Sequence, residues 1–218
     1  MASEVDVSNM ALSLLGSDAA VVSLNPPDGS AEAGHCKRFY ALARRQALEI
    51  AGFSWTKKRA ALASVTNPSD VWSYAYQLPG DCITPLRVLQ KNFADNALLD
   101  TYTARVVTAD ELRVMTEALG ADFQIEGSVL LTHEPDAVLL YTRDITDLTP
   151  FSATFISGLS YLLASFIAGP IIKGKEGAAA GRELRAAATS ILADAAVQDT
   201  APGSESQDFL PSSLRARR

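Results

Sequence analysis

Apolar residues recur at three- and four-residue intervals near the amino terminus, a period that predicts two helices. The first is expected over residues 4–15, with Ser3 as its N-cap and Gly16 at its end. The second follows Ser30 and runs to residue 50, after a loop rich in turn-forming residues at positions 23–29. The apolar side of this second helix consists of Cys36, Phe39, Tyr40, Ala43, Ala47 and Ile50.

From residue 58 the pattern changes to short segments rich in valine, leucine, tyrosine and tryptophan. Turn sequences such as Asn67-Pro68 and Pro79-Gly80 separate these segments. Short apolar segments at this spacing are typical of antiparallel strands. Residues 109–119 lie among them and fit a short helix instead. The strands are expected at residues 58–65, 71–78, 83–89, 98–107, 123–126, 129–132 and 137–141.

The last third of the chain returns to helical periodicity. One helix is expected over residues 151–168, starting at Thr149 or Pro150, and a second over residues 176–198. A glycine-containing hinge at Gly174 separates the two. Glycine and alanine are dense over residues 177–181, so a neighbouring helix can approach closely there. From residue 199 the composition is too polar to bury much surface.

Helices at both ends and strands between them predict an α+β protein. We expect residues 1–57 and 148–198 to form a helical bundle, with residues 58–147 inserted as an antiparallel β-rich domain. Residues 199–218 are expected to form an extended C-terminal arm. At 218 residues and 48% hydrophobic composition, the chain can bury a substantial core. No βαβ alternation suggests a nucleotide-binding sheet.

Residues 151–172 carry no charge and are long enough to cross a bilayer. Serine, threonine and glycine dilute this stretch and Pro170 interrupts its end. We therefore favour a buried helix of a soluble protein over a membrane span. The amino terminus is acidic and lacks the basic segment of a signal peptide.

The formal net charge of −6 argues against a protein that reads DNA through clustered lysine and arginine. It is compatible with an acidic channel wall past which DNA slides. The two cysteines, Cys36 and Cys82, lie far apart and are expected to be reduced thiols. The short basic runs around Arg44 and Lys58 are interpreted as solvated surface.

No residue pattern indicates catalysis, so we expect no enzyme, no metal and no cofactor. Residues 169–175 fit the glycine-lysine spacing of a phosphate-binding loop, but Glu176 replaces the hydroxyl residue that would bind magnesium. His35 and His133 are a hundred residues apart in sequence, and neither has metal-ligand spacing. Asp144 and Asp147 are interpreted as turn and capping residues.

Two further groups are candidates for contacts. Trp72, Tyr74 and Tyr76 alternate along one expected strand and are assigned to the β-domain core or to an interface. The C-terminal arm combines a few apolar residues with a basic end, the form of a peptide that folds on binding. Both docking and a solvated tail remain open for it from composition alone. The residues expected to dock are Phe209, Leu210, Leu214, Arg215, Arg217 and Arg218.

Four blocks of sequence occur in a recognisable order. The first is Cys36-Lys-Arg-Phe-Tyr with Arg44 and Leu48, continued by Phe53-x-Trp55-x-x-Lys58-Arg-Ala-Ala-Leu62. The second is Trp72-Ser-Tyr-Ala-Tyr-Gln-Leu-Pro-Gly-Asp-Cys82. The third runs from Ile125-Glu-Gly to Tyr141, and the fourth is Asp144-Ile-Thr-Asp147 before Pro150. Together they resemble the tail tubular protein A family of short-tailed bacteriophages related to T7. The first block departs from the family in the order of its aromatic pair and in having Arg45 where an acidic residue is usual.

The resemblance implies a head-to-tail adaptor, a structural virion protein that is assembled in the host cytoplasm. It implies a homo-oligomeric ring, a dodecamer, with the portal protein above it and the tail nozzle or other tail proteins below. DNA would pass through the channel without sequence-specific binding, during genome retention and ejection. In such an adaptor, the C-terminal arm is the candidate segment for portal binding. A tail terminator or stopper ring at the same junction is the alternative.

Overall fold

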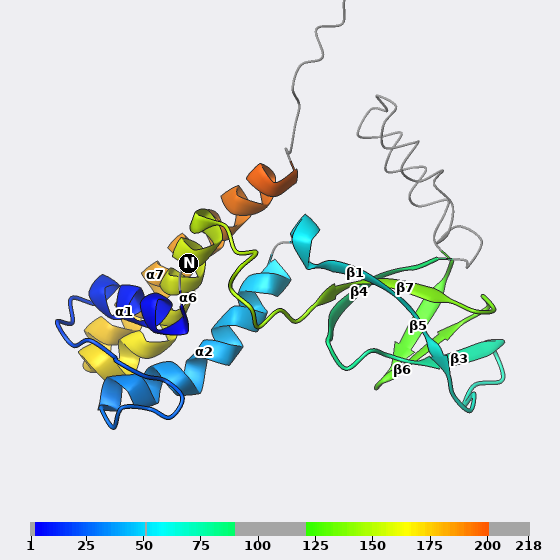
Figure 1. The fold of residues 1–218 in the computed structure, drawn as a ribbon, viewed down its shortest axis with the longest axis horizontal. Helices are drawn as coiled ribbons and strands as arrows, with labels where there is room; N and C mark the ends of the chain where they lie inside the picture. The colour runs from blue at the N-terminus through cyan, green and yellow to red at the C-terminus, as the bar shows by residue number, and fades with distance from the viewer. Residues whose placement is uncertain (1–2, 51, 90–120, 201–218) are drawn as a thin grey trace, which may run out of the picture. The chain divides into compact units, whose positions relative to one another are not determined.

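The computed structural model describes residues 3–50, 52–89 and 121–200 of the chain. The chain divides into two compact units, one made of Met1–Ala43 and Phe151–Arg218 and the other of Arg44–Pro150 (Figure 1). The predicted α+β class with antiparallel sheets is confirmed. The unit boundary falls inside a helix at residue 43, whereas we expected it at residue 57, because the end of that helix packs with the strands. The expected strand at 98–107, the segment 109–119 and the arm 201–218 lie outside the described residues.

The first unit is helical (Figure 1). It contains α1 (Glu4–Leu14), most of α2 (Ala31–Ile50), α6 (Ala153–Ile172) and α7 (Gly174–Thr200). The α1 helix begins where predicted because Ser3 and Asp6 form a capping box, with Asp6 N–H donating to Ser3 Oγ at 3.1 Å and Ser3 N–H donating to the Asp6 carboxylate at 2.8 Å. Gly16, with φ of +70°, ends it in the left-handed conformation.

The α6 helix differs from its prediction at both ends. Ser152, rather than Thr149 or Pro150, caps it by accepting a hydrogen bond from Phe155 N–H. The helix continues through Pro170 to Ile172, beyond the predicted end at residue 168. A proline this close to a helix end leaves few backbone bonds to break, so the last turn survives.

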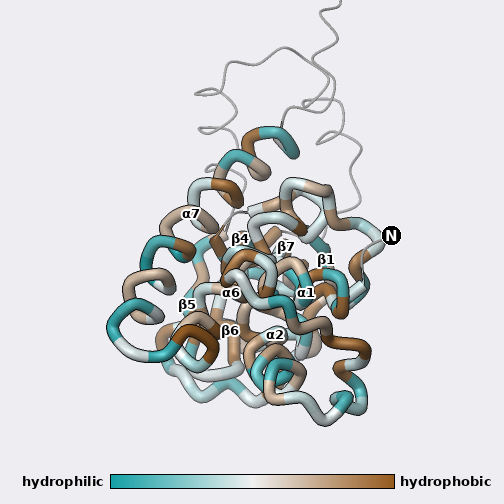
Figure 2. Tube along the Cα trace, turned by 90° about the vertical axis from the view of Figure 1, so that its left-hand side faces the viewer, coloured by the Kyte–Doolittle hydropathy of each residue, from teal (hydrophilic) through white to brown (hydrophobic). Residues whose placement is uncertain are grey.

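The α7 helix follows α6 after a single residue. Lys173 and Gly174 have φ values of +64° and +65°, and this left-handed pair reverses the chain. Gly177 and Gly181 then lie against the backbone of α6, since a Cβ atom on either glycine would approach a carbonyl oxygen of α6 to 2.9 Å or 3.0 Å. Hydrophobic and hydrophilic segments alternate along α7 (Figure 2), as expected of a helix that packs on one side only.

The second unit contains two antiparallel sheets. One is three-stranded with the order β1-β7-β4, and the other is four-stranded with the order β2-β3-β6-β5. A short 3₁₀ helix, η1 (Ser54–Thr56), leads into β1. The strands are β1 (Lys57–Ala61), β2 (Ala63–Ser64), β3 (Tyr74–Gln77), β4 (Cys82–Leu89), β5 (Phe123–Glu126), β6 (Val129–Thr132) and β7 (Val138–Arg143).

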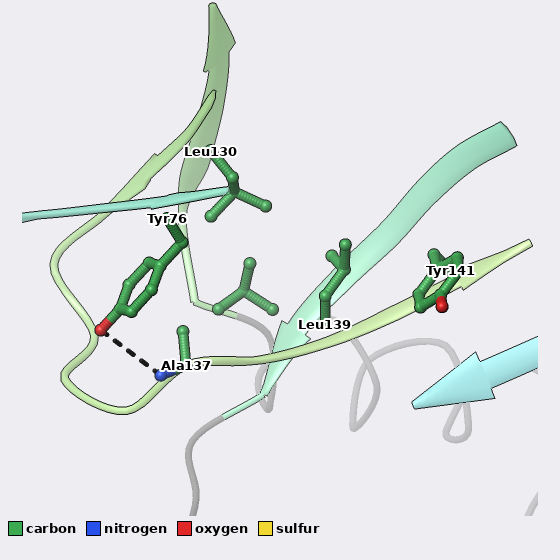
Figure 3. Packing of buried hydrophobic residues seen from close by; sticks show 6 residues of the cluster. Tyr76, Leu130, Ala137, Leu139 and Tyr141 are labelled. Atoms are coloured by element: carbon green, nitrogen blue, oxygen red, sulfur yellow. Dashed lines mark hydrogen bonds between the residues drawn. The ribbon is translucent and has the colours of Figure 1, made fainter. Parts of the chain in front are cut away.

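The core of this unit draws residues from both sheets (Figure 3). Tyr76 of β3 donates a hydrogen bond to the carbonyl of Glu134 at 2.9 Å, and Ala137 N–H donates to the Tyr76 hydroxyl at 3.5 Å. These bonds fasten the turn between β6 and β7 over the core. The buried cluster consists of Tyr76, Val88, Leu130, Ala137, Leu139 and Tyr141.

Candidate functional site

Three polar side chains meet at one end of the three-stranded sheet. Lys58 of β1 lies directly opposite Tyr141 of β7, and Asp81 lies in the turn before β4. The Lys58 ammonium contacts one oxygen of the Asp81 carboxylate at 2.9 Å, and the Tyr141 hydroxyl donates to the other at 2.7 Å. We call these residues the Lys58–Asp81–Tyr141 cluster. It ties two strands of the sheet to the turn that precedes the third.

The cluster perturbs the acidity of its members in the directions expected for a satisfied network. The hydrogen bond from Lys58 lowers the pKa of Asp81, and the bond to Asp81 raises the pKa of Lys58. Burial raises the pKa of Tyr141, and the hydrogen bond to Asp81 raises it further. The Tyr141 ring is buried, but Lys58 and Asp81 are 45% and 37% exposed, so the polar end of the cluster faces solvent.

An ion pair between Arg44 and Asp144 lies beside this cluster. We call the cluster and the ion pair the two polar ties. One terminal nitrogen of the Arg44 guanidinium contacts both oxygens of the Asp144 carboxylate, at 2.9 Å and 3.2 Å. The Arg44 side chain is 8% exposed and that of Asp144 is 25% exposed. The backbone N–H of Asp144 donates to the carbonyl of Asp81 at 2.7 Å, so the two ties share a backbone connection. The buried Nε of Arg44 has no hydrogen-bond partner within the described parts of the chain.

These ties are suited to holding a helix end, strands and a turn together and not to moving protons. The Asp81 carboxylate is fully engaged by a cation and a hydroxyl, which keeps it ionised. Over residues 3–50, 52–89 and 121–200, no three His, Cys, Asp or Glu side chains are grouped so that they could hold a metal ion. Burial raises the pKa of the Cys36 and Cys82 thiols, so both favour the protonated, unreactive form.

An open groove in the helical unit also lacks convergent chemistry. It has a volume of about 510 Å³ and lies between α1 and α6. Met10 and Leu14 contribute much of its apolar wall. The Asp6 carboxylate lines it too, but this group accepts the N–H and hydroxyl bonds of Ser3.

The three aromatic residues assigned to the β-domain core or an interface occupy different positions. Tyr76 is buried in the core cluster, and Tyr74 is 40% exposed with its ring 6.4 Å from that of Tyr76. Trp72 precedes β3, so strand alternation does not apply to it. Its indole N–H donates to Gln124, whose register partner on β6 is Leu131. Tyr74 and Tyr76 pair with Thr132 and Leu130, whose side chains lie on the opposite face of β6 from Leu131. The Trp72 indole contacts Gln124, which shares the face of Leu131, so Trp72 lies on the other face of the sheet from the two tyrosines.

The remaining sequence candidates have ordinary structural positions. His133 stacks against Trp72 with ring centroids 4.8 Å apart, and its Nδ1 lies 3.0 Å from Ser73 Oγ. The glycine-lysine segment at 169–175 spans the end of α6 and the start of α7, and no strand leads into it. The docking residues proposed for the C-terminal arm lie outside the described residues.

The α6 helix is long and apolar enough to cross a membrane, and half of its most apolar window is buried inside the protein. Leu159, Leu162, Leu163 and Ile167 are fully buried. Burial of these apolar side chains is typical of a helix in the core of a globular protein.

Sequence reasoning missed a group of cations that the sheet register brings together. Lys57, Arg59 and Arg87 come from two strands that are distant in sequence, and they share one face of the three-stranded sheet. Lys57 and Arg59 belong to the short basic run around Lys58 that is interpreted from the sequence as solvated surface, but only the pairing of β1 and β4 with the same central strand brings Arg87 to them.

Comparison with known proteins adds no assignment to this geometry: no protein-family model matches the chain, and no curated protein matches it.

Proposed function

We propose that this protein is a structural subunit of a tailed-bacteriophage virion, a head-to-tail adaptor. In this proposal its copies form a ring, a dodecamer, that joins the portal to the tail and continues the DNA channel. The assignment rests on the ordered sequence blocks that resemble the tail tubular protein A family. It treats the chain as a non-enzymatic protein with protein partners above and below the ring.

One observation carries the proposal. Side chains from all four blocks meet in the two polar ties of the β unit. Arg44 of the first block binds Asp144 of the fourth. Lys58 of the first block binds Asp81 of the second, and Asp81 accepts a hydrogen bond from Tyr141 of the third. Blocks that matched by chance would have no reason to converge, whereas blocks that mark one architecture would.

The described residues also favour a structural role on chemical grounds. Each carboxylate of the two ties is paired with a cation, and the cysteine thiols favour their protonated form. A subunit that must hold its shape under load needs strands that are tied together, and the two ties supply this. The alternative function, a tail terminator or stopper ring, shares these features and differs only in its binding partner.

Negative-stain electron microscopy of the purified protein, alone and mixed with its cognate portal, tests the proposal. We expect rings that stack coaxially on the portal. Rings that form but ignore the portal would overturn the adaptor assignment in favour of the terminator or stopper. A protein that neither forms rings nor binds portal would overturn both.

The portal-binding part of the proposal has its own test. We expect a variant that ends at residue 198 to lose portal binding, because the arm with Phe209, Leu210 and the terminal arginines is the proposed docking segment. Undiminished portal binding by this variant would show that the arm is not the docking segment, and it would leave the ring assignment unchanged.

A further inference from the structure

The register of the three-stranded sheet separates its two faces. Ala60 of β1 and Val88 of β4 both pair with Leu139 of β7, and all three belong to the buried core. The neighbouring row consists of Arg59, Leu140 and Arg87, paired in the same way. Because side chains alternate between faces along a strand, this row lies on the outer face. Lys57 is two residues from Arg59 and lies on the outer face as well.

The three cations of this outer face are close together. Residues two apart on a strand are separated by about 7 Å, and residues two strands apart by about 10 Å. Lys57, Arg59 and Arg87 therefore lie within about 12 Å of one another. Lys57 and Arg59 are exposed and Arg87 is half-buried. We call this group the basic face.

The basic face has no counter-charge among the residues that the structure describes. The two ion pairs found over the described ranges are Arg44–Asp144 and Lys58–Asp81, so other cations of the same unit are already neutralised. Lys57, Arg59 and Arg87 form no ion pair with any described residue. Three neighbouring positive charges that form no ion pair with a described residue contrast with the formal net charge of −6 of the whole chain.

Fold stability does not explain this arrangement. Like charges on one face of a sheet repel, and the two arginines flank an apolar residue, Leu140, that offers them no hydrogen bond. Lys57 and Arg59 are exposed and lie on the face opposite the core, so the core requires no cation at either position. A group of cations that forms no ion pair with a described residue is suited to an external polyanion.

We propose that the basic face binds the phosphate backbone of duplex DNA without reading its sequence. Duplex DNA carries one charge for about every 1.7 Å of its axis, so three cations within about 12 Å can each engage a phosphate. Recognition of bases needs an element that enters a groove, and a sheet face with Leu140 at its centre supplies only charge. This inference rests on the proposed function, in which DNA passes the subunit, and it names side chains that contact it.

The test is fluorescence anisotropy with a labelled duplex of about 30 base pairs and arbitrary sequence, using the full chain at several salt concentrations. The variant Lys57→Gln/Arg59→Gln/Arg87→Gln removes the basic face. The matched control, Lys37→Gln/Arg38→Gln/Lys175→Gln, removes three exposed cations from the helical unit. Both changes lie on the surface, so equal unfolding midpoints in urea show that each variant is folded.

We expect the wild type and the control to bind DNA, and the basic-face variant to bind at least tenfold more weakly at low salt. The slope of log affinity against log salt should fall in magnitude by about 2–3, because each lost phosphate contact removes about 0.9. Equal binding by the variant and the control would overturn the proposal, as would a wild type that does not bind DNA.

One rival occupant is the acidic surface of a second copy. Sedimentation velocity distinguishes it: a basic-face variant that keeps DNA binding but loses self-association would assign this face to a contact between copies and overturn the proposal. The portal takes no part in these measurements. DNA binding through the basic face with no ring on the portal would therefore overturn the adaptor assignment alone. A ring on the portal with no DNA binding through the basic face would overturn only the inference about DNA.

Discussion

The helical unit and the β unit are stabilised in different ways. In the helical unit, α6 and α7 approach closely because Gly158, Gly177 and Gly181 have no side chain at their contact points. In the β unit, two ion pairs are found over the described residues: Lys58–Asp81 ties β1 to the turn before β4, and Arg44–Asp144 ties the end of α2 to the segment after β7. The stability of the helical unit should therefore be sensitive to side-chain volume added between α6 and α7. The stability of the β unit should be sensitive to the loss of a charged group.

The difference fits the sequence of each unit. Alanine and glycine dominate the start of α7, where a small interhelical distance maximises van der Waals contact. The strands of the β unit are short, and β1 is mostly exposed, so apolar burial alone gives it little anchorage. The Lys58–Asp81–Tyr141 cluster compensates by fixing β1 and the turn before β4 to the central strand β7.

Removing a charge from the β unit is expected to have the largest effect. Asp144→Asn leaves the buried Arg44 guanidinium without its counter-charge, which should lower the free energy of unfolding by about 3 kcal/mol. Urea unfolding followed by tryptophan fluorescence measures this, since Trp55 and Trp72 both lie in the β unit. The double variant Arg44→Met/Asp144→Asn should recover part of the loss. A single variant as stable as the wild type would show that the pair contributes nothing.

Adding volume to the helical unit should have the next largest effect. A Cβ atom at Gly177 would lie 2.9 Å from the carbonyl oxygen of Ala168, and backbone cannot move aside cheaply. Gly177→Ala is expected to cost about 2 kcal/mol. Gly34→Ala in α2 is the matched control, because no atom lies within 4 Å of its added methyl group.

The control should stabilise the protein by about 0.5–1 kcal/mol, as alanine restricts the unfolded chain and favours helix. Thermal unfolding followed by circular dichroism compares the two variants. If both substitutions shift the midpoint in the same direction, close packing between α6 and α7 is not what holds this unit.

The smallest expected effect concerns the Lys58–Asp81–Tyr141 cluster. Tyr141→Phe removes one hydrogen bond and should cost about 1 kcal/mol at neutral pH. The pKa values of Tyr141 and Lys58 are raised on folding, so their contribution is complete below their ordinary values near 10 and is lost as the pH rises through the folded values. The pKa of Asp81 is lowered, so its contribution is lost only as the pH falls below about 4.

Urea unfolding between pH 7 and pH 11 tests whether the free energy of unfolding falls at alkaline pH, as the raised pKa values of Tyr141 and Lys58 predict. Wild-type stability should decline above about pH 10, and Tyr141→Phe should decline less because one of the two alkaline groups is gone. Parallel curves for the two proteins would mean that the tyrosine hydroxyl does not take part in the tie.

The sequence predicted the elements well where the signal was local. The N-cap at Ser3, the stop at Gly16 and the strands at 123–126 and 129–132 depend on a few adjacent residues, and each appears where expected. The end of α6 was misplaced because a proline in the last turn of a helix is tolerated when few backbone bonds remain. Trp72 was wrongly placed on the strand because the strand begins at Tyr74, three residues later than its apolar pattern indicated.

The sites depended on information that is not local. The partners Arg44 and Asp144 are separated by 100 residues, and the basic face combines β1 with β4 across β7. Neither follows from periodicity, since both require knowing which strands are neighbours. The resemblance to the adaptor family supplied several of these residues as motif positions, but the register supplied the reason that they belong together.

The most direct test of the adaptor assignment is the mass of the complex formed when the purified protein is added to cognate portal rings, measured by mass photometry. The account predicts a single new species whose added mass equals one complete ring of subunits, twelve for the dodecamer. A portal mass that does not change at saturating protein would contradict it.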